Sequence, residues 1–203
     1  MKARLAGSLF SIAVAVLLLV GCDDSKNPLS NPQTSKPDAR LAGLWRQQDT
    51  SGNTNFYHIG RAGESLPEGV MRVISAAHSG DGELHEPGQL LIFPTTLAGA
   101  TYLNVTDGNK QQVKLIEEQG WKGVDSYILL KYKVDGDTLL VWPTDGDAKK
   151  KAIESGKVKG LVEKQDSGTK VVFTDTTENL ARFFAGAADS LFAKEPIRLE
   201  RVK

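Results

Sequence analysis

One stretch of the sequence, SYILLKYKVDGDTLLVW at residues 126–142, is the most informative about the fold. Its first half alternates between two faces, with Lys131 and Lys133 on one and Ile128, Leu130, Tyr132 and Val134 on the other. Strict alternation of apolar and polar residues is typical of a half-buried strand. Asp135-Gly136 then supplies the positive φ angles that a tight turn requires. The stretch therefore predicts an antiparallel β-hairpin.

Similar short segments, separated by Gly, Asp and Asn, occur on both sides of this hairpin. They predict strands at residues 43–48, 55–59, 70–77, 89–94, 101–106, 110–117, 126–134, 138–142, 160–164, 170–174 and 197–202. Many short strands with frequent turn signals indicate a mainly β domain, built as an antiparallel barrel or sandwich. Residues 39–203 are numerous enough to bury a sizeable core, so we expect one globular domain.

Two short helices are predicted among the strands. The first covers residues 145–155, where Thr144 and Asp147 form a capping-box start and Gly156 suits a left-handed stop. The second opens at Asp175, with an acid three residues later. Its apolar residues follow helical spacing: Leu180, Phe183, Phe184, Ala187 and Leu191.

The composition narrows the class of protein. The 203 residues include 25 basic and 25 acidic side chains and a single Cys. Most nucleic-acid-binding proteins carry an excess of basic residues on one face, whereas this chain has a net charge of zero. We therefore expect no nucleic-acid partner. One Cys excludes an intrachain disulfide and any zinc site built from several cysteines.

The amino terminus has the pattern of a secretory signal peptide. Lys2 and Arg4 precede an apolar run at residues 5–20, whose most apolar part, residues 12–20, is well short of the ~20 residues needed to span a bilayer. The run ends in Leu19-Val20-Gly21-Cys22, which resembles the lipobox of bacterial lipoproteins. In that family the peptide is cleaved before the Cys, its thiol is diacylated, and the new amino terminus is usually acylated too. The resemblance implies a signal peptide at residues 1–21 and a lipid anchor on Cys22.

The residues after the anchor suggest a location and a spacer. Asp23 and Asp24 are similar to the signal that retains some lipoproteins in the inner membrane, which implies its periplasmic face; an ordinary polar linker is the alternative. Residues 23–38 hold three Pro and one large apolar residue, Leu29. Such a composition does not favour order. We therefore expect residues 22–38 to be the lipidated Cys and a disordered tether, up to ~55 Å long when extended.

The first predicted strand carries a second resemblance. Leu41-Ala42-Gly43-Leu44-Trp45 resembles the Gly-x-Trp motif that opens lipocalin-like barrels. In those folds the Trp closes one end of the barrel and a basic residue near the last strand packs over it. The resemblance implies that Trp45 takes this place and that Arg198 or Arg201 covers it by a cation–π contact.

Catalytic and cofactor motifs are absent from the sequence. It contains no Gly-x-Ser-x-Gly, Ser-x-x-Lys, His-Glu-x-x-His, Gly-x-Gly-x-x-Gly or Walker pattern. Residues 78–86 place two His among three acids, but their spacing matches no closed zinc site and their glycines indicate a polar loop. We expect neither an enzyme, nor a cofactor, nor a bound metal.

Two non-enzymatic functions remain. In the first, the barrel carries a small apolar or amphipathic ligand; Phe183 and Phe184 form a lid, and Trp45 and Arg198 contribute to the pocket. In the second, the domain is an interaction module that docks another protein of the cell envelope, because the tether suits presentation of a surface. The membrane, reached through the lipid on Cys22, is a partner in both.

Overall fold

The predicted hairpin is confirmed in the computed structural model, which describes residues 25–48, 52–79, 83–124, 126–165 and 168–203. Strand β6 (Ile128–Asp135) pairs with β7 (Thr138–Pro143), and Asp135 lies opposite Thr138. Gly136, in the turn, has a φ of 59°. Only glycine adopts this conformation without a steric penalty, which explains why the chain reverses here.

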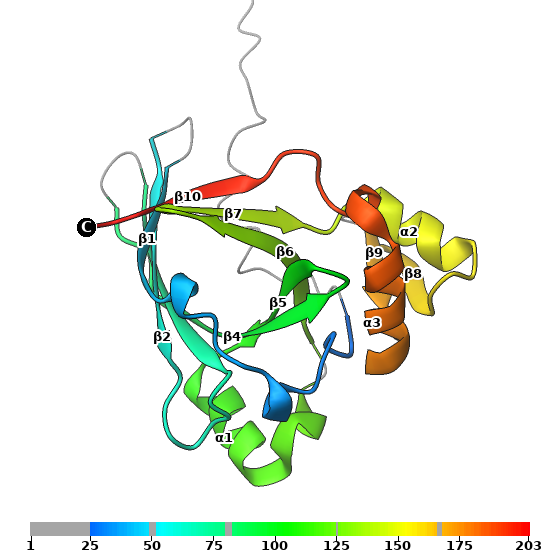
Figure 1. Ribbon diagram of the computed structural model, residues 1–203, viewed down its shortest axis with the longest axis horizontal. Helices are drawn as coiled ribbons and strands as arrows, with labels where there is room; N and C mark the ends of the chain where they lie inside the picture. Colours follow the sequence, from blue (N-terminus) through cyan, green and yellow to red (C-terminus); the bar gives the residue numbers. More distant parts are fainter. Residues whose placement is uncertain (1–24, 49–51, 80–82, 125, 166–167) are drawn as a thin grey trace, which may run out of the picture.

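The hairpin belongs to a closed antiparallel barrel, so the predicted fold class is confirmed (Figure 1). The strand order is β1-β10-β7-β6-β5-β4-β3-β2, and β1 closes the barrel by pairing with both β2 and β10. The other strands are β1 (Gly43–Gln48), β2 (Thr54–Arg61), β3 (Met71–His78), β4 (Gly88–Leu97), β5 (Ala100–Asp107) and β10 (Ile197–Arg201).

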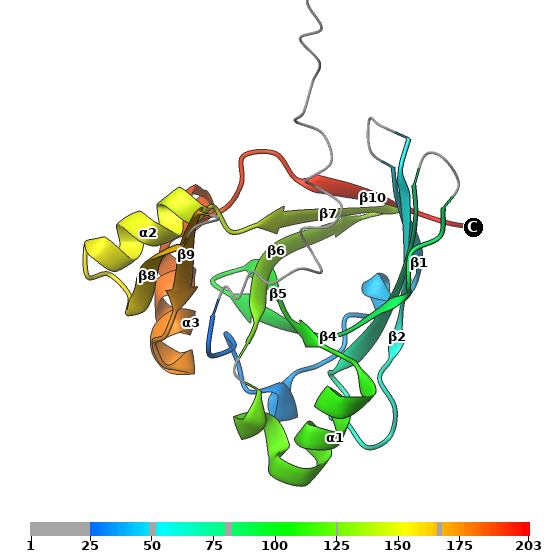
Figure 2. The same cartoon turned by 180° about the vertical axis from the view of Figure 1, so that it is seen from behind.

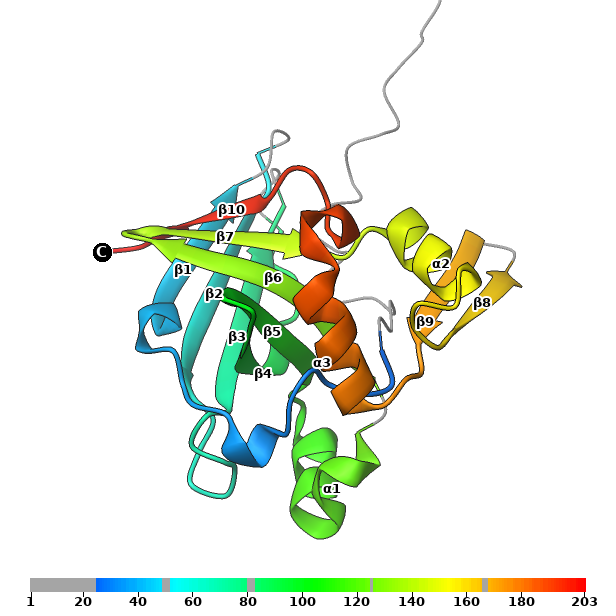
Figure 3. The ribbon, with the colours of Figure 1, turned by 45° about the vertical axis from the view of Figure 1, so that its right-hand side comes forward.

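Between β7 and β10 the chain leaves the barrel and forms a separate unit, which we call the insertion (residues 144–196). It contains α2 (Gly146–Glu154), α3 (Thr177–Gly186) and a two-stranded sheet of β8 (Gly160–Gln165) and β9 (Gly168–Phe173). Figure 3 shows this unit beside the barrel. Both predicted helices and both predicted strands are therefore present, but these two strands do not join the barrel wall.

One predicted strand is wrong. Residues 110–117 lie in helix α1 (Lys110–Gln119), because the Asn109 side chain accepts a hydrogen bond from the backbone N–H of Gln112 and caps the helix. Gly120 ends it with a φ of 68°. The helix packs Ile116 and Val113, three residues apart, against the core. Short 3₁₀ helices complete the elements: η2 (Pro32–Thr34), η3 (Ala39–Leu41), η4 (Gly120–Gly123) and η5 (Ala188–Leu191).

The chain has two apolar cores, because the barrel wall is apolar on both faces along part of its circumference. The inner core fills the barrel with side chains that include Trp45, Tyr57, Ile59, Met71, Val73, Ile92, Leu103, Val105, Leu130, Tyr132, Leu139, Val141 and Leu199. The outer core lies outside β4, β5 and β6, whose outward residues Leu91, Phe93, Tyr102 and Leu129 are buried. Helix α1, the insertion and the segment before β1 supply its other side.

The expected disordered tether is not what the structure shows for residues 25–38. Leu29 is only 1% exposed and lies in the outer core. Its backbone N–H donates to Asn104 Oδ1 at 2.6 Å, and the fully buried Asn104 amide donates to Phe93 O and Thr95 Oγ1. The outer face of the barrel thus gives this segment an apolar contact for Leu29 and a hydrogen-bond acceptor, Asn104 Oδ1. Both interactions favour an ordered conformation. We call residues 25–38 the docked segment; Cys22, Asp23 and Asp24 lie outside the described residues.

The docked segment predicts a strong effect of one glycine. A Cβ at Gly69, in the loop between β2 and β3, would collide with the backbone carbonyl of Ser35 and approach Lys36 N to 2.8 Å. We expect Gly69→Ala to lower the free energy of unfolding by about 1–3 kcal/mol, the usual cost of overpacking. Chemical denaturation measures this loss. Gly60→Ala is the control, because its Cβ meets no atom within 4 Å; equal losses for the two variants would contradict the close approach.

Candidate functional site

The end of the barrel where β1 begins is closed by a group of side chains that the sequence pointed to in part. Trp45 is fully buried, and its Nε1–H donates to Leu41 O at 2.7 Å. The guanidinium of Arg201 lies 4.2 Å from the centre of the Trp45 ring and donates to Ala42 O and Arg40 O. Arg201, rather than Arg198, therefore makes the cation–π contact. Arg198 is exposed and donates to Thr138 Oγ1 on the outside of the barrel, so its placement in a pocket was wrong.

A polar contact ties the docked segment to the same closed end. Asp38 forms an ion pair with Arg40 at 2.8 Å and accepts a hydrogen bond from Tyr132 OH at 3.0 Å. The bond from Arg40 is the main reason why the pKa of the Asp38 carboxyl lies below its usual value. Burial, with the nearby Asp38, raises the pKa of Tyr132. The carboxylate therefore stays ionised and the phenol neutral near pH 7, the forms that this hydrogen bond requires.

The interior of the barrel changes character toward its other end. Gln47, Asn55, Tyr57 and Ser75 are buried there. Tyr57 OH donates to Gln47 Oε1 at 3.2 Å, and burial raises the pKa of Tyr57 to about 12. Asn55 Nδ2 is buried without a hydrogen-bond partner. We call this region the inner polar end. An unpaired buried amide costs about 1–3 kcal/mol of folding free energy. Within the described interior of the barrel, a polar ligand atom would therefore be most favourable here.

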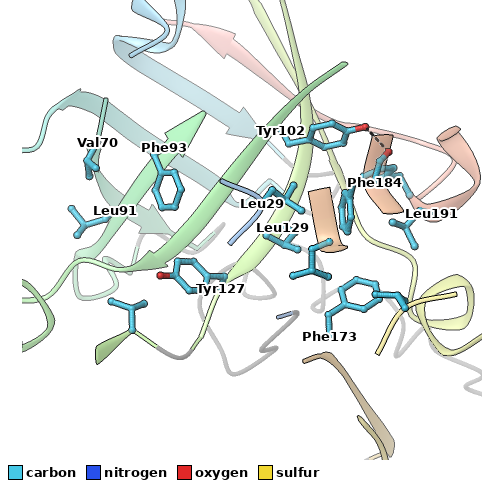
Figure 4. Close-up of a cluster of buried hydrophobic side chains, with 14 of the residues drawn as sticks. Leu29, Val70, Leu91, Phe93, Tyr102, Tyr127, Leu129, Phe173, Phe184 and Leu191 are labelled. Atoms are coloured by element: carbon cyan, nitrogen blue, oxygen red, sulfur yellow. Dashed lines mark hydrogen bonds between the residues drawn. The ribbon is translucent and has the colours of Figure 1, made fainter. Parts of the chain in front are cut away.

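The Phe183-Phe184 pair does not cover the mouth of the barrel, and the predicted lid is wrong. Phe184 is 2% exposed and lies in the outer core, with its ring centre 5.7 Å from that of Tyr102, 5.9 Å from Phe173 and 6.0 Å from Phe192 (Figure 4). Phe183 is half-buried and contacts Phe173. These rings join the insertion to the outside of the barrel wall, because aromatic pairs favour such edge-to-face packing.

Other candidate sites lie on the surface. The described residues do not bring three His, Cys, Asp or Glu side chains together as a metal site would need. Of the polar loop, His78 and His85 are exposed, and residues 80–82 lie outside the described ranges. The surface also has two depressions. One is lined by the N-cap Asn109 and by residues of α1 such as Lys114, and the other by the loop between β2 and β3. Neither opens into the barrel interior along its lining residues.

One side of the barrel has an outer face that the described residues leave uncovered. We call it the bare wall: the outward residues of β10, β1, β2 and β3. Leu44, His58 and Ile74 lie opposite one another on adjacent strands, and Phe56 and Ala76 form the next row. Leu44 is 37% exposed and Ile74 is 44% exposed. The insertion lies on the opposite side of the barrel from β1 and β2 (Figures 1 and 2). This surface is not evident from the sequence, since its residues belong to different strands whose order no local pattern reveals.

Charged side chains lie around these two rows. The outward positions carry Arg46, Arg72 and Arg198 against one acid, Glu200. Arg46 and Glu200 form an exposed pair at 3.2 Å. The bare wall therefore presents Leu44 and Ile74 on either side of His58 and carries an excess of guanidinium groups.

Comparison with known proteins identifies no relative of this chain: neither a family model, nor a curated protein, nor a solved structure matches it. Within the described ranges, no helix is long and apolar enough to cross a membrane.

Proposed function

We propose that the chain is a bacterial lipoprotein, anchored through Cys22 at the periplasmic face of a membrane, whose barrel acts as a non-enzymatic docking module for another envelope protein. The observation that carries the docking function is the bare wall, with Leu44, His58 and Ile74 in one row. Isolated exposed apolar residues are common on proteins, but here Leu44 and Ile74 are exposed on either side of His58, with Phe56 and Ala76 in the adjacent row, so the apolar side chains gather on one face. The cluster of apolar side chains packed inside the barrel supports the same proposal, because these residues contact one another and not a partner.

The charge of the bare wall specifies the chemistry of the partner. Three arginines against one glutamate favour a protein that presents apolar side chains bordered by carboxylates. Arg side chains bind carboxylates in bidentate geometry, which gives both orientation and specificity. The partner that fits best is therefore an acidic-rimmed apolar surface of a protein.

The test is site-specific crosslinking in cells, with a photoreactive amino acid at His58. We expect one adduct of defined mass, whose crosslinked peptide contains apolar and acidic residues. The adduct should be lost when Ile74→Glu is added, because a carboxylate then replaces an apolar contact and repels the acidic rim. The matched control is Leu161→Glu on β8, which changes an equally exposed apolar residue away from the bare wall. An adduct that survives Ile74→Glu, or no adduct at all, would contradict the proposal.

A second candidate function, carriage of a small ligand, has one observation in its favour. The unpaired Asn55 Nδ2 at the inner polar end would gain a hydrogen bond from a ligand atom. Native mass spectrometry without detergent separates the two functions, if applied to residues 25–203 so that the docked segment is kept. A bound small molecule that is lost on Asn55→Leu supports the carrier, whereas a bare polypeptide mass leaves the docking module.

A further inference from the structure

The docked segment begins at a residue that is fixed to two parts of the molecule. Ser25 is fully buried; its backbone N–H donates to Tyr127 O at 3.0 Å, and its carbonyl accepts from Tyr127 N at 2.8 Å. The next N–H, of Lys26, donates to Phe173 O at 2.8 Å. Ser25 thus connects two parts of the molecule: Tyr127, just before β6 of the barrel, and Phe173, at the end of β9 in the insertion.

The distance from this fixed point to the anchor is set by covalent geometry. Only Asp23 and Asp24 separate Cys22 from Ser25. Three steps between successive Cα atoms span at most about 11 Å, whatever conformation these residues adopt. The polar head-group region of one leaflet is itself roughly 5–8 Å thick. An acylated Cys22, held at the inner boundary of that region, therefore allows Ser25 to lie at most about 3–6 Å beyond the head groups, too short a distance for a spacer between membrane and domain.

We infer that the domain lies directly on the membrane, with the surface around Ser25 against the phospholipid head groups and the bare wall directed away from the bilayer. This inference rests on the proposed lipid anchor at Cys22. The contact surface comprises the half-buried Asn27 and the start of α3, where Thr176 and Glu178 are exposed. The two parts are held together because Asn27 Nδ2 donates to Asp175 O at 2.9 Å. Ser25 is bridged to Phe173 at the end of β9, and β9 lies across the barrel from β1 and β2 (Figures 1 and 3).

The other contacts of this surface explain why it stays rigid. The Asp175 carboxylate accepts from Lys159 N at 3.0 Å, from Thr176 N at 2.9 Å and from Asn179 Nδ2 at 2.7 Å. The Thr176 side chain accepts from Asn179 N and caps α3. The first turn of α3, including the exposed Glu178, is thereby held close to the point where the anchor enters the fold.

The experiment uses the full lipidated chain in vesicles of phosphatidylethanolamine and phosphatidylglycerol that contain a lipid with a nitroxide on its head group. Because Cys22 is the only Cys and carries the lipid, a second Cys gives a unique thiol for a fluorescent label. One variant is Glu178→Cys, near Ser25, and the matched variant is Ala76→Cys, exposed on the bare wall. We expect the label at 178 to be quenched several-fold more strongly than the label at 76.

A longer linker provides the control. An insert of about 12 Gly and Ser residues between Asp24 and Ser25 has a root-mean-square length of roughly 19 Å and should remove the difference in quenching. Equal quenching at the two positions without the insert would overturn the inference while the lipid anchor stands. If intact mass shows an unmodified Cys22 and the chain does not enter the vesicles, the lipoprotein proposal itself fails.

Discussion

Replacing Trp45 with alanine is expected to lower the free energy of unfolding by about 3–5 kcal/mol, the range for a fully buried large aromatic side chain. Three contacts are lost together: the packing of the ring in the inner core, the hydrogen bond to Leu41 O, and the surface on which the Arg201 guanidinium rests. The hydrogen bond holds η3 across the closed end of the barrel, so its loss also loosens that end. Denaturant unfolding of residues 25–203 measures the effect.

Trp142→Ala is the matched control for this prediction. Trp142 is half-buried beside the outer core, with Lys131 Nζ 5.4 Å from the centre of its ring. It has the same chemistry and a cation neighbour, but it lacks full burial and does not close the barrel. We expect a clearly smaller loss for Trp142→Ala. Similar losses for the two tryptophans would mean that Trp45 is not the residue that closes this end.

Phe184→Ala is also expected to lower the free energy of unfolding by about 3–5 kcal/mol, for a different reason. Its ring contacts Tyr102 on β5, Phe173 on β9 and Phe192 after η5, so it links the insertion to the barrel wall. For a domain of this size each kcal/mol lowers the melting temperature by about 2–4 °C, and calorimetry or circular dichroism will detect the change.

The neighbouring residue gives the control. Phe183 is half-buried and packs against the margin of the outer core. We therefore expect Phe183→Ala to lower the free energy of unfolding less than Phe184→Ala does. A loss that is equal or greater for Phe183→Ala would contradict the assignment of Phe184 to the centre of the outer core. Neither variant should alter the crosslinking that we propose at the bare wall, because this surface lies across the barrel.

Most of the barrel is predictable from local patterns in the sequence. The hairpin of β6 and β7 combines strict alternation with Asp135-Gly136, and both signals act within a few residues. The same holds for β1, where the predicted limits, residues 43–48, agree with the observed strand. Trp45 was identified through its resemblance to lipocalin-like barrels, and the structure places it at a closed end with Arg201 above it.

The wrong predictions have two causes. One is a local helix signal that alternation outweighed, and the other is a contact with residues far away in the sequence. In residues 110–117, Val113 and Leu115 alternate as in a strand, but the Asn109 cap and the turn at Gly120 favour the helix. The docked segment has the composition of a linker; what orders it is Asn104, 75 positions away from Leu29. The position of Phe184 likewise depends on Tyr102, which is 82 positions away. Local composition contains no information about such partners.

The pairing of β1 with β10 has a consequence for how the chain reaches its native state. Trp45 lies opposite Arg201, 156 positions later, and β10 pairs with both β1 and β7. A polypeptide that emerges amino terminus first from a ribosome or a translocation channel has to expose the edges of β1 and β7 until β10 appears. Pairings of such large sequence separation form slowly, and unpaired edges invite association with other strands. Strand β10 therefore acts as the seam of the barrel, and a chain that lacks it would keep both edges exposed to association with other strands.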